Sequence, residues 1–70
     1  MKKFELKDSD HIALCDLLKR TGMCENGGAA KNFIGQGLVY VNGEVETRKR
    51  YKVRENEIIE FQNEKIKVVK

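Results

Sequence analysis

The sequence predicts a small α+β domain in which two short helices pack on a mainly antiparallel sheet of about four to five short strands. Apolar residues first recur at helical spacing and later alternate with polar residues at strand spacing, and an Asn-Gly pair separates two of the later apolar runs. A chain of 70 residues forms one domain at most. We therefore assign residues 1–70 to a single domain.

The first third of the chain predicts one strand and one helix. Phe4–Lys7 alternates apolar and polar residues, as a half-buried strand does. Asp8–Asp10 offers three candidate N-caps for a helix. An apolar stripe at helical spacing runs from Ile12 to Leu18. Gly22 is the expected stop of this helix.

The rest of the chain predicts a second helix and two hairpins. The helix should begin after Asn26, a good N-cap, and end at Gly37. Its glycines each cost about 1 kcal/mol relative to alanine, so packing must hold it. Asn42-Gly43 favours a type I′ hairpin turn. Ile58–Phe61 and Lys65–Val69 predict the final hairpin.

Size and composition place the function on the surface. A chain this short buries only about 60% of its unfolded surface, which leaves little room for a ligand cavity, so we expect no cofactor. The net charge is only +3, but residues 48–54 hold five positive charges and no negative ones. Such a patch favours a polyanionic partner. No signal peptide or membrane span is evident, so we expect a cytoplasmic monomer that does not bind a membrane.

No pattern of catalytic or metal-binding residues is evident. The spacing of Gly22 and Gly27 resembles the start of a P-loop, but Gly28-Ala29 replaces the required Lys-Ser/Thr pair. The only histidine and the two cysteines, Cys15 and Cys24, have no recognised zinc spacing. The sequence therefore predicts neither an enzyme nor a metal site. We expect Cys15 to be buried and Cys24 to be accessible in the turn between the helices.

The cations offer a candidate surface for a phosphate backbone. If residues 48–54 are extended, alternate side chains share one face about 6.6 Å apart. The alternative is a solvated edge strand, where charges discourage aggregation. Lys19 and Arg20 end the first helix and Lys31 should face outward on the second, so these cations could share a surface. Tyr40 is the better candidate for stacking on a base, because Tyr51 should pack inward.

A spaced pattern then resembles a known family. It consists of Leu17-Leu18, Gly22, Ala30-Lys31, Phe33-Ile34, Gly37, Val39 and Val41-Asn42-Gly43-Glu44. This pattern is similar to the RNA-binding domain named after ribosomal protein S-four, and residues 45–50 resemble its small stand-alone bacterial members. The resemblance implies an αL motif, two helices followed by a β-hairpin, that binds structured RNA such as ribosomal or transfer RNA, with association to the ribosome.

The resemblance also implies which residues contact RNA. Lys31 matches the basic position after the motif's alanine, whereas Gly27 and Gly35 stand where many members carry arginine. The expected RNA-binding residues are Lys19, Arg20, Lys31, Gln36, Asn42, Arg48, Lys49, Arg50 and Lys52. The alternative function is a protein–protein interaction module that uses the basic patch or an edge strand.

Overall fold

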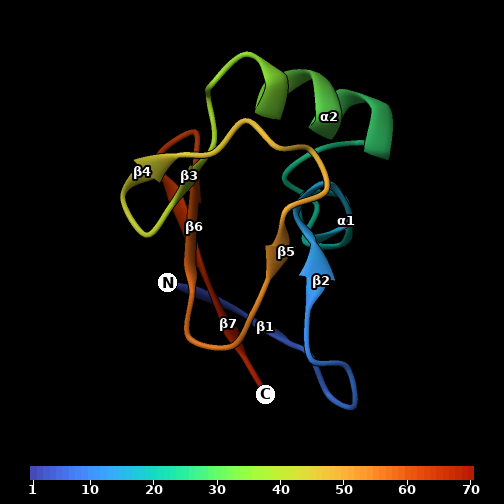
Figure 1. Cartoon of the computed structure of the whole chain (residues 1–70), viewed down its shortest axis with the longest axis vertical. Helices are drawn as coiled ribbons and strands as arrows, with labels where there is room; N and C mark the ends of the chain where they lie inside the picture. Colours follow the sequence, from blue (N-terminus) through green and yellow to red (C-terminus); the bar gives the residue numbers. More distant parts are fainter.

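Nine short elements make up the fold, and the computed structural model describes all of residues 1–70 (Figure 1). In chain order they are β1 (Lys2–Glu5), β2 (Ile12–Ala13), α1 (Leu14–Arg20), α2 (Gly27–Gly35), β3 (Tyr40–Val41), β4 (Glu44–Val45), β5 (Lys52–Val53), β6 (Ile58–Phe61) and β7 (Glu64–Val69). Neither helix is long and apolar enough to cross a membrane.

The principal sheet has five strands in the order β1-β7-β6-β3-β4. β1 runs parallel to β7, with Phe4 opposite Val68, and the other pairs are antiparallel. The fold class is therefore confirmed. The predicted first strand lies two residues too late, because the left-handed conformation of Lys7, at φ 58°, ends the extended segment.

A second sheet of two strands was not predicted, and it changes the start of the first helix. β2 pairs with β5 so that Ile12 lies opposite Val53. The helix therefore begins at Leu14, and the prediction that Asp8–Asp10 caps it is wrong. Its N-cap, Ala13, makes no side-chain bond. The amides of Leu14 and Cys15 donate instead to the carbonyls of Tyr51 (2.9 Å) and Lys49 (3.2 Å).

The expected ends of the helices are confirmed at three other positions. Asn26 caps α2, because its Oδ1 accepts a hydrogen bond of 2.8 Å from the amide of Ala29. Gly22 and Gly37 follow the two helices with φ of 81° and 79°, the left-handed region that favours glycine. Local signals therefore determine where α2 begins and where both helices end.

The core lies between the helices and the inner face of the principal sheet. Leu14, Leu17, Leu18 and Ile34 from the helices and Ile59 from β6 are fully buried. This packing supports a second helix that contains three glycines and is a poor helix by propensity alone.

Both cysteines belong to this core as free thiols. The expectation for Cys15 is confirmed, but Cys24 is only 5% exposed, so its predicted accessibility is wrong. The turn folds back on α1, where the amide of Cys24 donates to the carbonyl of Leu18 at 3.1 Å. Burial raises the pKa of the Cys24 thiol.

Two tight turns connect the hairpin strands. Asn42 and Gly43 have φ of 51° and 85°, as the predicted type I′ turn requires. Gln62 and Asn63, with φ of 53° and 66°, form the β6–β7 turn without a glycine. Glu64, which lies between the two strands predicted for this hairpin, is instead the first residue of β7.

Candidate nucleic-acid interface

Residues 48–54, which we call the basic segment, are not one extended strand. The amide of Tyr51 donates to the carbonyl of Arg48 at 3.2 Å, which closes a turn, and only Lys52–Val53 forms a strand. The expectation of an extended row is therefore wrong. The turn nevertheless gathers side chains around one shallow depression of about 380 Å³, which is lined by Arg48, Arg50, Tyr51, Lys52 and Arg54.

The backbone of the basic segment is held against both helices. The carbonyls of Lys49 and Tyr51 accept hydrogen bonds from the first two amides of α1. Figure 1 shows the chain after β4 passing along α2 before it turns down into β5. Lys49 lies over Gly35 near the end of α2, where a Cβ on Gly35 would be 3.2 Å from the Lys49 Cε atom. The segment is thus positioned by the fold before any partner arrives.

Arg48 is already engaged with an acidic neighbour. Its Nε and Nη2 atoms donate to the two carboxylate oxygens of Glu46 at 2.8 and 2.9 Å. Its guanidinium carbon also lies 4.9 Å from the centre of the Tyr51 ring. The hydrogen bonds from Arg48 hold the pKa of the Glu46 carboxyl below its usual value. Of the residues expected to contact RNA, Arg48 is therefore the one already in an ion pair.

Glu57 ties the basic segment to the β3–β4 hairpin. Its carboxylate accepts hydrogen bonds from the Tyr51 hydroxyl at 2.6 Å and from the Arg54 amide at 2.8 Å. A longer bond of 3.4 Å comes from Asn42 Nδ2, while Asn42 Oδ1 accepts from the Ile58 amide at 2.9 Å. Asn42 thus already has partners within the protein, and its contact with RNA stays a prediction.

The substitution Tyr51→Phe tests this connection. We expect it to lower the free energy of unfolding by about 1 kcal/mol, because it removes the hydrogen bond to Glu57. That bond, followed by burial, raises the pKa of the Tyr51 hydroxyl above 10.0. The stabilisation is therefore complete below pH 10 and is lost as the pH rises through the raised value. Urea denaturation at neutral and alkaline pH measures both effects, and an unchanged midpoint at neutral pH would contradict them.

Six of the expected RNA-binding cations take part in none of the four ion pairs of the structure. They are Lys19, Arg20, Lys31, Lys49, Arg50 and Lys52, and all six are exposed. Lys31 lies on α2 and Gln36 is the exposed C-cap of that helix. We call the unpaired cations of α2 and of the basic segment the α2–loop surface and treat them as the candidate interface: Lys31, Lys49, Arg50 and Lys52.

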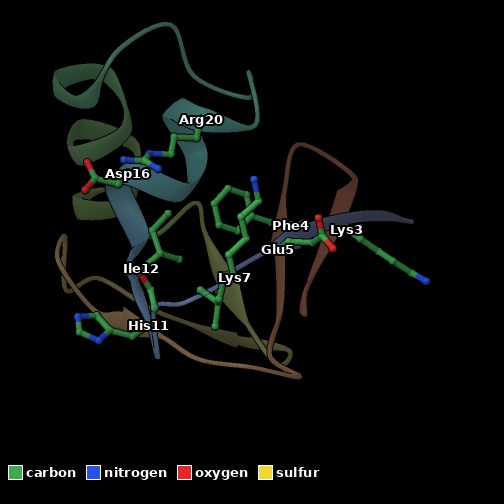
Figure 2. Close-up of a pocket in the computed structure, with 10 residues that line it drawn as sticks. Lys3, Phe4, Glu5, Lys7, His11, Ile12, Asp16 and Arg20 are labelled. Carbon is green, nitrogen blue, oxygen red and sulfur yellow. The ribbon is translucent and has the colours of Figure 1, made fainter. Parts of the chain in front are cut away.

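Arg20 lies in a different place. It lines a second depression of about 550 Å³, which also holds Lys3, Phe4, Lys7 and Asp16 and lies between α1 and the N-terminal strand (Figure 2). The two depressions share no lining residue. Arg20 thus borders a different depression from the one that the basic segment lines.

Other candidate groups are placed as follows. Tyr40 is 39% exposed and lies opposite Val45, whereas Tyr51 is half-buried against the core, as expected for both. His11 is near the surface, with its Nδ1 atom 2.6 Å from Asp10 Oδ1. No three histidine, cysteine, aspartate or glutamate side chains lie together in a way that could hold a metal ion.

Sequence reasoning missed the two acidic residues that shape the basic segment. Glu46 and Glu57 lie just outside the run of cations, and both turn back to bind it. A signal for this exists in the sequence, since acids that flank a basic run are candidates for ion pairs and caps. Their positions show that not every cation of the run is equally free.

Comparisons with known proteins agree with this architecture. Residues 4–69 match the family model described as the S4 domain. YbcJ from Escherichia coli (strain K12) and YbcJ from Shigella flexneri are each 44% identical over 69 residues, which cover 99% of both chains. The solution structure of E. coli YbcJ, described as revealing an αL motif involved in RNA binding, has a TM-score of 0.77. It shares 43% identity and covers 100% of this chain and 89% of that one. The chain therefore belongs to the S4 domain family.

Proposed function

We propose that this protein binds structured RNA through the α2–loop surface. The observation that carries the proposal is a set of exposed cations without acidic partners: Lys31, Lys49, Arg50 and Lys52. Their backbone is already fixed by bonds to α1 and by the packing of α2. The description of the E. coli relative as an RNA-binding αL protein supports the same assignment.

Binding proceeds by docking a preformed charged surface onto phosphates. Each lysine or arginine that neutralises a phosphate releases bound counterions, which drives association. Arg50 can bind phosphate in a bidentate manner, while the lysines act as compact point charges. Because double-stranded RNA is recognised mainly by shape and by its 2′-hydroxyls, we expect little sequence specificity. Ribosomal or transfer RNA, met in the cytoplasm or on the ribosome, is the proposed partner.

The function is tested by measuring RNA affinity over a series of salt concentrations. The probes are bulk transfer RNA and bulk ribosomal RNA, each titrated with the purified protein. We expect binding at low salt and a steep fall in affinity as salt rises, with a logarithmic slope of about one unit per phosphate contact. Failure to bind either RNA at low salt, or affinity that ignores salt, would overturn the proposal.

The competing protein-interaction function makes a different prediction. An acidic protein partner would also be released by salt, so salt alone does not separate the two functions. Ribonuclease treatment does, because it destroys only an RNA-mediated association. Complexes isolated from cells should therefore disperse after treatment, and complexes that survive it would favour a protein partner.

A further inference from the structure

Among the glycines of α2, only Gly35 is covered by a side chain that comes from outside the helix and its N-cap. A Cβ atom at this position would lie 3.2 Å from Lys49 Cε and 3.8 Å from Lys49 Nζ. The same construction at Gly27 meets nothing within 4 Å, and at Gly28 it meets only the capping side chain of Asn26. The bare backbone at Gly35 is therefore covered by the end of a lysine that comes from another part of the chain.

The backbone of Gly35 does not require glycine. Its φ is not positive, in contrast to Gly22, Gly37 and Gly43. A glycine inside a helix costs roughly 0.5–1 kcal/mol relative to alanine. The gain that offsets this cost is the space that glycine leaves, and Lys49 occupies that space.

The main chain of Lys49 is fixed while its charge is free. Its carbonyl accepts a hydrogen bond of 3.2 Å from the amide of Cys15, which ties the residue to the start of α1. Its ammonium group is in none of the ion pairs. It lies near the carboxyl end of α2, where the helix dipole favours a positive charge. Lys49 therefore places an unneutralised cation on a helix that has no basic residue of its own in its last turn.

This cation lies on the helix face that already carries Lys31. Residues four apart in a helix are neighbours on one face, so Lys31 and Gly35 belong to the same stripe of α2. Lys49 extends that stripe by one charge at the position of Gly35.

We propose that Gly35 is a positioning residue of the RNA surface: it leaves the space in which the Lys49 side chain lies, so that the Lys49 ammonium group contacts a phosphate in line with Lys31. The inference rests on the proposed RNA-binding function and adds to it. The second phosphate contact of the α2 face is supplied by the basic segment and requires a glycine on the helix beneath it. A methyl group at position 35 would lie 3.2 Å from Lys49 Cε, so the end of that lysine would have to move away from the helix while the charge of the protein stays the same.

The substitution Gly35→Ala tests the proposal, with Gly27→Ala as its matched control. Both replace a glycine of α2 by a better helix former and leave the net charge unchanged. We expect both variants to melt at or above the temperature of the parent, since the only atoms in the way at Gly35 are the flexible end of Lys49. With bulk transfer RNA and bulk ribosomal RNA as probes, Gly35→Ala should bind about two- to fivefold more weakly, and Gly27→Ala like the parent.

A second pair of variants assigns the loss to Lys49. In a Lys49→Ala background, Gly35→Ala should cause no further loss of affinity, because the group that it displaces is gone. Combining Lys49→Ala with Gly35→Arg should restore part of the affinity, since a cation returns to the same helix face. An NMR contact between the Lys49 Hε and Gly35 Hα protons checks the placement in the free protein.

The outcomes separate this inference from the function on which it rests. If the parent binds neither RNA, the proposed function and the inference both fail. If the parent binds and Gly35→Ala binds equally well, the RNA-binding function stands, but the role assigned to Gly35 in positioning Lys49 is wrong. Equal losses for Gly35→Ala and Gly27→Ala would also overturn the inference, because they would point to the flexibility of α2 rather than to Lys49.

Discussion

Leu18→Ala is expected to remove most of the stability of the protein at 25 °C. Leu18 is a fully buried core residue. Truncation of a buried leucine to alanine costs about 2–5 kcal/mol, and the core of a domain this small supplies roughly 3–5 kcal/mol of net stability. Circular dichroism during urea denaturation should show a midpoint near or below zero urea.

The matched control is Leu38→Ala, which makes the same chemical change on the surface. Leu38 is 46% exposed, and such substitutions usually change stability by less than about 0.5 kcal/mol. RNA binding should be lost in Leu18→Ala and kept in Leu38→Ala, because the basic segment is anchored to the first turn of α1. Equal destabilisation by the two changes would contradict the assignment of the core.

The features that were predicted correctly depend on interactions between near neighbours. Asn26 caps α2 through an amide three residues away. Gly37 and Asn42-Gly43 act through their own backbone angles. Alternation along the final hairpin requires only that one face be buried, and Ile59 and Phe61 lie on that face. Each of these signals depends on only a few neighbouring residues, so it can be recognised in a single sequence.

The features that were missed depend on contacts between distant parts of the chain. Ile12 fits a helical stripe, but it pairs with Val53 of β5, and this pairing delays the start of α1. The basic segment looks like a strand when read alone, but the Tyr51 amide bonds the Arg48 carbonyl to close a turn, and the first amides of α1 bond its backbone. Local pattern therefore favours the wrong structure at both places, because tertiary contacts outweigh propensity.

The candidate site shows the same division. The sequence shows where the cations are, but it does not show which of them are free of ion pairs and can bind a phosphate. Arg48 is neutralised by Glu46, whereas Lys49 has no acidic partner and reaches across to Gly35. Which cations remain free is decided by the turn at residues 48–51 and by its anchoring to α1. Spacing along the chain carries no information on these contacts.

The triple variant Lys49→Ala/Arg50→Ala/Lys52→Ala is expected to lower RNA affinity roughly tenfold or more at low salt. All three side chains are exposed and outside the ion pairs, so the fold should remain intact. If each contacts a phosphate, the slope of log affinity against log salt should decrease by about three units. Affinity at several salt concentrations, together with thermal melts, measures both effects.

Its matched control is Lys3→Ala/Lys67→Ala/Lys70→Ala, which removes three cations elsewhere. Either triple takes the formal net charge from +3 to zero, so the two proteins differ only in where the charge was lost. Lys3 and Lys67 face each other in the β1–β7 pair, and Lys70 follows β7, far along the chain from the basic segment. A protein attracted to RNA by net charge alone would lose the same affinity in both variants. A protein that docks through the α2–loop surface should lose its affinity and its salt slope only in the first variant. Equal binding by the first variant and the parent would reject that surface, because three of its four cations are absent from that variant.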